Sequence, residues 1–462
     1  MQADSRKIIS ENIVADRSKL KIICVFLHRI YFGRIPYERQ YRGKKRKAMN
    51  ITELQQSYAS HPNVEGVCRL LKDNSVRHLY CGGLYASAAS LFSSVLVQRA
   101  TCPLVFILGD MEEAGYFYHD LTQILGTEQV LFFPSSFRRA IKYGQKDAAN
   151  EILRTEVLSR LQKGEEGLCV VTYPDALAEK VVSRKELGEN TLKLHAGERV
   201  DMNFVTDVLR SYGFEYVDYV YEPGQYAVRG SIIDVFSFSS EYPFRIDFFG
   251  DEVESVRTFE VETQLSKEKK ESIVIVPDLS HSLEKKGSGG MVSFLDFLPS
   301  DSLLAMRDFL WLRERIQTVH DESLTPQAIA ARESEENGAI TLEGKLIDGG
   351  EFTLRALDFR RMEFGNKPTG TPDATVSFHT TVQPIFHKNF DMVAESFREY
   401  LSRHYTIYIC SDSLKQTDRI HAIFEDRGDN ISFTAVERTL HEGFADDTLR
   451  ICVFTDHQLF DR

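Results

Sequence analysis

The chain has 462 residues, of which 42 % are hydrophobic and 27 % are charged, and it carries 56 Lys and Arg against 68 Asp and Glu. At about 150 residues per domain, this length predicts about three domains, and the composition is that of a globular protein. Because no run approaches the roughly 18 apolar residues that a membrane helix needs, the sequence excludes an integral membrane protein and predicts no membrane partner.

The charges divide the chain into a basic start and an acidic body. Residues 1–48 hold 13 Lys and Arg and 4 Asp and Glu, whereas the remaining residues hold 43 Lys and Arg and 64 Asp and Glu, a net charge of −21. We interpret 1–48 as a basic extension that is disordered or belongs to a misassigned start codon; the alternative is an arm that binds nucleic acid. The acidic body disfavours a broad DNA contact and favours a protein partner.

The cysteines indicate the redox environment. They are odd in number and no two are spaced as C-x-x-C, which is typical of reduced, mostly buried thiols in a cytoplasmic protein and disfavours a zinc site. The seven positions are Cys24, Cys68, Cys81, Cys102, Cys169, Cys410 and Cys452.

Residues 49–180 are predicted to form the first part of an α/β domain with a parallel sheet. Short apolar runs typical of buried strands alternate there with amphipathic stretches typical of helices. The predicted strands are Val76–Cys81, Leu104–Leu108, Val130–Phe133 and Leu168–Thr172, and the predicted helices are Ala86–Gln98, Glu112–Leu125 and Ala148–Leu161.

The turn after the first of these strands is in register with the phosphate-binding pattern G-x-x-x-x-G-K-[S/T], beginning at Gly83 and ending at Ser90. Ala88 and Ala89 replace the second glycine and the lysine, so the turn lacks the main contact with the β and γ phosphates. An ordinary strand-to-helix turn explains the match equally well, and an active nucleotide-dependent enzyme is the rival hypothesis.

A later strand reinforces this interpretation. Leu303–Met306 is predicted to be a buried strand that ends in Arg307-Asp308, where magnesium binding would require carboxylates rather than a cation. We therefore predict a degenerate nucleotide site without ATP hydrolysis, and no catalytic residue, metal site or cofactor. The degenerate site comprises Gly83, Ala88, Ala89, Ser90 and Asp308.

Residues 181–265 are predicted to form a β-rich insert, because Tyr226–Phe238 and Phe244–Phe259 are rich in strand-forming residues and Gly250-Asp251 is a turn signal. A period of two sorts residues 244–249 onto two faces. The first face is apolar and is predicted to be core: Phe244, Ile246 and Phe248. The second face carries Arg245, Asp247 and Phe249.

The second face has the composition of a protein-binding hot spot, since an arginine and an aromatic ring flank a carboxylate on a rigid strand. Arg229 from the preceding β segment is expected to join it, and Gly230 beside it indicates a bulge or a close backbone approach. The alternative is that Arg245 pairs with a local carboxylate while Phe249 covers the sheet edge.

The rest of the chain returns to α/β patterning. Residues 266–378 are predicted to complete the first domain, with buried strands at Ile273–Val276 and Leu303–Met306 and flexible loops at Ser280–Gly290 and Gly365–Ala374. Residues 379–462 are predicted to form a small α/β domain. Its expected strands are Tyr405–Cys410, Ile431–Val436 and Leu449–Thr455, with helices at about 390–403 and 413–425.

Two linked segments resemble a known family. They are Glu-Pro-Gly-Gln-Tyr-Ala-Val-Arg-Gly-Ser-Ile-Ile-Asp-Val-Phe at 222–236 and Arg-Ile-Asp-Phe-Phe-Gly-Asp-Glu-Val-Glu-Ser-Val-Arg at 245–257, and Phe386-His387-Lys388-Asn389-Phe390 adds a third. They closely resemble the bacterial transcription-repair coupling factors (Mfd), and the excision-repair protein UvrB has a similar segment. The resemblance covers roughly 49–462.

The resemblance implies a UvrB-like module: an α/β domain with a dead nucleotide site, interrupted by a β-rich domain that docks the repair protein UvrA, followed by a small α/β domain. Arg229, Arg245 and Phe249 stand where the UvrA-contacting arginine, arginine and phenylalanine of that family stand. The family's further domains grip RNA polymerase and use ATP and magnesium to translocate on duplex DNA, and we expect this chain to be an N-terminal fragment without that motor.

Overall fold

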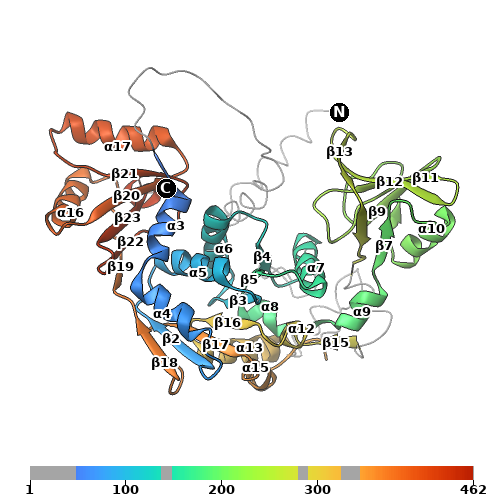
Figure 1. Ribbon diagram of the computed structural model, residues 1–462, viewed down its shortest axis with the longest axis horizontal. Helices are drawn as coiled ribbons and strands as arrows, with labels where there is room; N and C mark the ends of the chain where they lie inside the picture. Colours follow the sequence, from blue (N-terminus) through green and yellow to red (C-terminus); the bar gives the residue numbers. More distant parts are fainter. Residues whose placement is uncertain (1–47, 137–147, 279–289, 324–343, 461–462) are drawn as a thin grey trace.

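The computed structural model describes residues 48–136, 148–278, 290–323 and 344–460. The predicted basic extension at 1–48 therefore lies, except for Ala48, outside the described residues, as does the predicted loop at 280–290 except for Gly290. Three large sheets lie in a row along the molecule, with a parallel sheet in the middle, the β-rich sheet at one end and the sheet of the small domain at the other (Figure 1). The fold is the predicted multidomain α/β architecture.

The central sheet has seven strands, all parallel, in the order β18-β2-β17-β16-β3-β5-β4. Most of these strands are apolar throughout because both faces of the sheet are covered by helices. The strands are β2 (His78–Gly82), β3 (Leu104–Ile107), β4 (Val130–Phe133), β5 (Cys169–Thr172), β16 (Leu303–Met306), β17 (Arg360–Gly365) and β18 (Ala374–Ser377).

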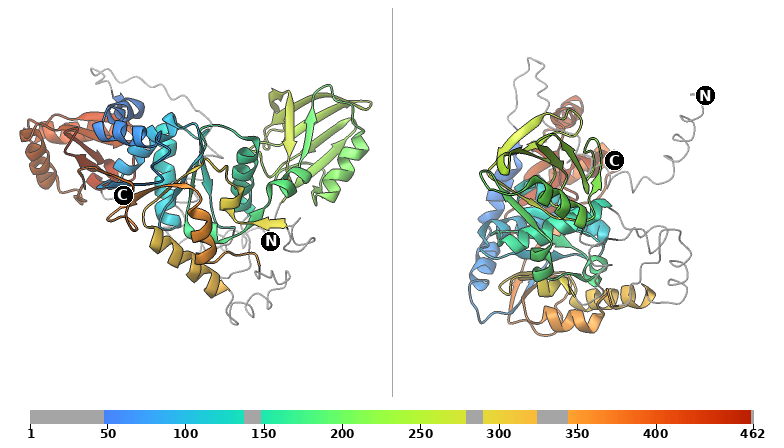
Figure 2. Two further views of the ribbon diagram at one scale, coloured as in Figure 1. Left: turned by 60° about the horizontal axis from the view of Figure 1, so that its bottom comes forward. Right: turned by 90° about the vertical axis from the view of Figure 1, so that its right-hand side faces the viewer.

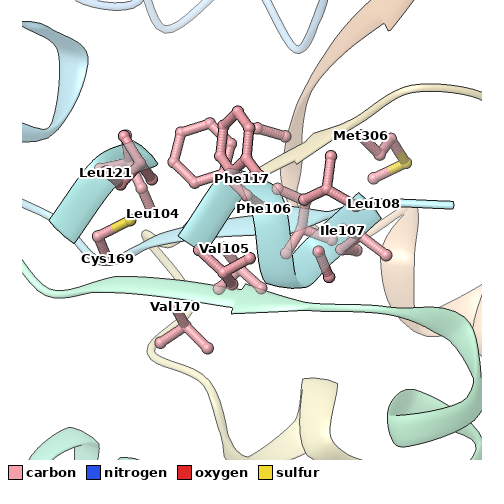
Figure 3. Close-up of a cluster of buried hydrophobic side chains, with 14 of the residues drawn as sticks. Leu104, Val105, Phe106, Ile107, Leu108, Phe117, Leu121, Cys169, Val170 and Met306 are labelled. Atoms are coloured by element: carbon pink, nitrogen blue, oxygen red, sulfur yellow. The ribbon is translucent and has the colours of Figure 1, made fainter. Parts of the chain in front are cut away.

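Helices lie on both sides of this sheet, as the turned views of Figure 2 also show. One group consists of α3 (Ile51–Ala59), α4 (Pro62–Leu70), α5 (Ala88–Arg99) and α6 (Met111–Leu125), and the other of α8 (Pro174–Ala178), α12 (Phe294–Phe297), α13 (Phe309–Ser323) and α15 (Gly349–Ala356); α7 (Ala148–Lys163) packs against β4. In the part of the core drawn in Figure 3, Phe117 and Leu121 of α6 gather with the side chains of β3. The rings of Phe106 and Phe117 are 5.2 Å apart.

The β-rich domain is built on a six-stranded sheet in the order β13-β12-β11-β10-β9-β8, in which every pair is antiparallel except β8 with β9. A separate antiparallel pair, β7 (Leu192–His195) with β14 (Ser272–Ile275), and helix α10 (Met202–Ser211) complete it. The strands of the main sheet are β8 (Glu215–Tyr216), β9 (Gln225–Arg229), β10 (Ile232–Val235), β11 (Phe244–Phe249), β12 (Glu252–Phe259) and β13 (Ser266–Lys270).

The limits of this domain differ from the predicted 181–265. At its start, β6 (Val181–Val182), α9 (Arg184–Glu189) and β15 (Met291–Val292) belong with the first domain, because Val181, Val182 and Leu187 pack into its core. At its end, β13 pairs with β12 and β14 pairs with β7, and Ile273 and Ile275 lie in the β-rich core. The apolar run Ile273–Val276 was predicted to be a buried strand of the first domain, but periodicity cannot tell such a strand from one in an antiparallel pair.

The small domain contains a mixed six-stranded sheet in the order β1-β21-β20-β23-β22-β19. Its first strand, β1 (Met49–Asn50), pairs with β21, so the first described residues of the chain belong to the sheet of the C-terminal domain. The remaining elements are β19 (Thr380–Val382), α16 (Phe390–Ser402), β20 (Thr406–Ser411), α17 (Leu414–Asp426), β21 (Thr434–Glu437), β22 (Phe444–Asp446), β23 (Ile451–Thr455) and α18 (Asp456–Phe460).

Candidate partner-binding site

Strand β11 has the two faces that its alternation predicts. Phe244, Ile246 and Phe248 are buried in the main core of the β-rich domain, on the side where α10 packs. The opposite side of the sheet, which we call the second face, carries Arg245, Asp247 and Phe249. Phe249, at the end of the strand, leaves 78 % of its surface exposed.

Asp234 of β10 is the electrostatic centre of the second face. Its carboxylate is fully buried and accepts hydrogen bonds from Arg245 Nε (2.7 Å, to Oδ1) and Arg245 Nη2 (2.8 Å, to Oδ2), and it also pairs with Arg229 Nη2. The pairing follows from register, since Asp234 lies opposite Ala227 on β9 and opposite Arg245 on β11. One buried carboxylate therefore holds two guanidinium groups side by side.

The two arginines differ in how firmly they are held. Arg245 keeps only 13 % of its side chain exposed, donates from Nη1 to the carbonyl oxygen of Gln264 (3.0 Å), and lies over the ring of Phe259 (4.4 Å). Hydrogen bonding to Asp234 is the largest cause of the raised pKa of Arg245. Arg229 keeps 34 % of its side chain exposed and lies 5.0 Å from the centre of the Tyr219 ring.

A small second core supports this face from within. It consists of Val220, Ala227, Phe236 and Phe259, and Val217 and Val261 pack against it. The same domain exposes large apolar side chains to solvent: Tyr219 (50 %), Tyr221 (57 %), Phe249 (78 %) and Leu265 (68 %). Exposed aromatic rings around partly free arginines are the composition of a protein-binding surface.

The structure places the three residues singled out from the sequence on one face of the sheet, but at different depths. Arg229 lies on β9, Arg245 and Phe249 lie on β11, and β10 runs between these two strands. Phe249 is exposed, Arg229 is partly exposed, and Arg245 is mostly covered. The alternative that Arg245 pairs with a local carboxylate is therefore correct for its contacts, and that carboxylate is Asp234. Sequence analysis missed Asp234, although the two-residue Gly230-Ser231 turn between β9 and β10 would have placed it beside Arg229.

Polar groups of the degenerate phosphate loop, Gly83–Ser90, form hydrogen bonds with residues of the small domain. Gly83 has φ +76°, and its carbonyl oxygen accepts from Thr380 Oγ1 (2.7 Å), which in turn accepts from Tyr85 N (2.9 Å). Ser87 N donates to the carbonyl oxygen of Glu442 (3.2 Å), and Glu442 N donates to Ser87 Oγ (3.0 Å). Backbone groups that would bind phosphate thus bind the small domain.

The other residues of the predicted nucleotide site have structural roles. Ala88 and Ala89 are buried at the start of α5, and Ser90 Oγ donates to Asp120 Oδ2 (2.9 Å). Asp308 follows β16, which β17 separates from β2, and its side chain accepts from Trp311 N (3.0 Å). Its neighbour Arg307 pairs with Glu113 (2.8 Å).

The sequence predictions also concern membrane helices, metal-binding groups and the state of the cysteines. In the described ranges, no helix is long and apolar enough to cross a membrane, and no group of three or more His, Cys, Asp or Glu side chains could hold a metal ion. The cysteines at 81, 169, 410 and 452 are free and buried, and burial raises the pKa of each thiol. Cys68 and Cys102 are free and half-buried, and Cys24 lies outside the described residues.

Comparison with known proteins identifies the β-rich domain first. Residues 192–281 match the family described as the UvrB interaction domain, and this stretch contains all the strands of the β-rich domain and the second face. Its limits agree with those of the structure rather than with the predicted 181–265.

The wider chain is similar to transcription-repair-coupling factors. It is 21 % identical over 456 residues to that of Bacillus subtilis (strain 168) and 22 % identical over 442 residues to that of Staphylococcus aureus (strain bovine RF122 / ET3-1), in each case covering 82 % of this chain and 38 % of the relative. The factor of Escherichia coli (strain K12) is 29 % identical over 198 residues, 42 % of this chain and 17 % of that protein. The chain spans less than half the length of these curated relatives.

Proposed function

We propose that the second face of the β-rich domain docks the excision-repair protein UvrA, and that the chain thereby takes part in coupling repair to transcription. The observation that carries the proposal is the set of Arg229 and Arg245, held together by Asp234, on the same face of the sheet as the exposed ring of Phe249. This set lies within the stretch that matches the UvrB interaction domain.

We infer a different role for each residue of the set from its surroundings. Phe249 offers a large ring that is already free of contacts with the core, so a partner can bury it at little reorganisation cost. Arg229 has N–H groups to donate to a partner. Arg245 instead donates its N–H groups to Asp234 and Gln264 and holds the strands of the face in place. We expect Phe249 and Arg229 to contact UvrA directly.

The remaining partners and activities of the coupling factors are also proposals for this chain. By resemblance, contacts with RNA polymerase and duplex DNA, and the use of ATP and magnesium, belong to other domains of that family. What supports docking rather than catalysis here is that Ser87 N, in the phosphate loop, is already bonded to Glu442. We propose a non-enzymatic, cytoplasmic role for the described domains, without a cofactor.

Titration calorimetry of UvrA with three forms of the chain tests the docking proposal. We expect Phe249→Ala to bind UvrA at least about tenfold more weakly than wild type, because an anchor of this kind typically contributes on the order of 2 kcal/mol. The matched control is Phe204→Ala, since Phe204 is another exposed phenylalanine of the same domain (55 %) but lies on α10, over the opposite face of the sheet. Equal affinities for wild type and both variants would refute the proposal.

A further inference from the structure

A short segment crosses the second face next to Arg229. Residues 217–222, between β8 and β9, are anchored by Val217 and by Val220, which is fully buried in the small second core. Gln264 Nε2 donates to the carbonyl oxygen of Val220 (3.4 Å), which ties the segment to the turn that also holds Arg245. With its valines fixed below, the segment presents Tyr219 and Tyr221 outward.

Tyr219 lies against the more exposed of the two arginines. The Cζ atom of Arg229 is 5.0 Å from the centre of the ring, within the range of a cation–π contact. The guanidinium is therefore held between the phenol ring and the carboxylate of Asp234. Among the described residues, these are the ring and ion-pair contacts that its side chain makes.

The comparison with Arg245 shows what this contact does. Arg245 has the same two kinds of partner, Asp234 and an aromatic ring, but its ring is the buried Phe259, and the Gln264 carbonyl adds a third contact. Arg229 lacks such a backbone contact in the described structure and depends on Asp234 and Tyr219. Without the ring, its flexible side chain would lose one of the two supports that aim its free N–H groups outward.

We propose that Tyr219 is a positioning residue for Arg229, holding the guanidinium ready to bind UvrA. This inference rests on the proposed docking of UvrA. Because the face of the ring makes the contact, the hydroxyl group is dispensable and the aromatic ring is not. Tyr219 therefore acts through Arg229 rather than through a hydrogen bond of its own.

Calorimetry with UvrA and the full chain separates these contributions. We expect Tyr219→Leu to weaken binding about threefold to tenfold, the range of a partly exposed cation–π contact, and Tyr219→Phe to bind within about twofold of wild type. Tyr216→Leu is the matched control, because Tyr216 is another exposed tyrosine of the same domain (59 %) but packs against Tyr226 of the main core, on the side of the sheet opposite the second face. It should also bind within about twofold of wild type.

A double mutant cycle supplies a result that a merely structural role would not give. In an Arg229→Ala background, Tyr219→Leu should cause little further loss, because the group that it positions is gone. Additive losses, a similar loss in Tyr216→Leu, or a Tyr219→Phe variant as weak as Tyr219→Leu would each overturn the inference. If Arg229→Ala and Phe249→Ala weaken binding but Tyr219→Leu does not, the inference fails and the docking proposal stands; if none of the three weakens binding, the docking proposal fails as well.

Discussion

The arginines of the second face are held in place by one residue, Asp234. A fully buried carboxylate is costly unless it is paired and hydrogen-bonded, and here two arginines from neighbouring strands meet that requirement. Because the pairs use register positions that the sheet fixes, the arginines keep their places without a partner present. The face is thus preorganised for binding, and its residues divide into those that hold the frame and those left free to contact a partner.

This division predicts different stability for two variants. Arg245→Ala removes two hydrogen bonds from buried Asp234 and should lower the free energy of opening β10 and β11 by about 1–3 kcal/mol. Phe249→Ala should change it by less than about 0.5 kcal/mol, because the ring is exposed. Amide hydrogen exchange in β10 and β11 measures this locally, which suits a chain of several domains. Equal protection in the two variants would contradict the assigned roles.

The sequence predicted this face in part. Alternation in 244–249 placed Phe249 outward and Phe248 inward, because a strand's side chains alternate whatever its neighbours are. The depth of Arg245 was not predictable in that way, since it depends on which residues of β10 and the 260–265 turn lie across from it. Register between strands is set by turns and packing. The two-residue turns Gly230-Ser231 and Gly250-Asp251 fix it for β9 with β10 and for β11 with β12, but the longer connection between β10 and β11 does not.

At the scale of an element, the Gly83–Ser90 loop has the shape of a strand-to-helix turn, but its backbone donors bind the small domain instead of a phosphate. A Cβ atom on Gly83 would lie 2.0 Å from the carbonyl oxygen of Phe378, and φ is positive there. The sequence pattern predicted the turn and its missing lysine. It could not predict that Glu442, 355 residues from Ser87, would take the backbone donor, because that contact is tertiary.

Two glycines with similar backbone angles test the packing around this loop. Gly83→Ala should lower the free energy of unfolding by more than about 2 kcal/mol, because strain at positive φ adds to a collision with fixed backbone. Gly230→Ala has φ +62° but no atom within 4 Å of its Cβ position, so about 1 kcal/mol is expected from strain alone. Thermal unfolding of the two variants measures the difference, and an equal loss would show that Gly83 is not closely packed.

Restoring the missing residues should not restore nucleotide binding. In the double variant Ala88→Gly, Ala89→Lys, the lysine would replace a side chain that is 2 % exposed, and Ser87 N would still be bonded to Glu442. We expect a lower unfolding temperature and, by equilibrium dialysis, no ATP binding at millimolar concentration; burying an unpaired ammonium is the cause of the destabilisation. Saturable ATP binding by the variant would show that the loop is still a usable phosphate site.

For the whole molecule, the first and the small domain are joined by buried polar contacts as well as by β1. Asp446 accepts from Tyr58 Oη (3.1 Å), and Asp120 accepts from His441 N (2.7 Å) and Ser90 Oγ (2.9 Å). The ring of His441 stacks on Tyr116 with centroids 3.5 Å apart. Strand β18 belongs to the central sheet and β19 to the sheet of the small domain, yet the strand Met49–Asn50 also belongs to that far sheet, which no local pattern reveals.

The stacked histidine predicts how this joint responds to pH. Burial lowers the pKa of His441, with His119 and His457 acting in the same direction and Asp120 and Glu112 opposing. Because the unfolded chain takes up a proton near pH 6.5 and the folded chain resists it, stability should fall as pH drops through about 6.5. Thermal unfolding between about pH 7.5 and pH 5.5 should therefore show a smaller loss in His441→Phe, which keeps the stack with Tyr116 but cannot be protonated. The same pH dependence in wild type and His441→Phe would show that the joint does not sense protonation at this ring.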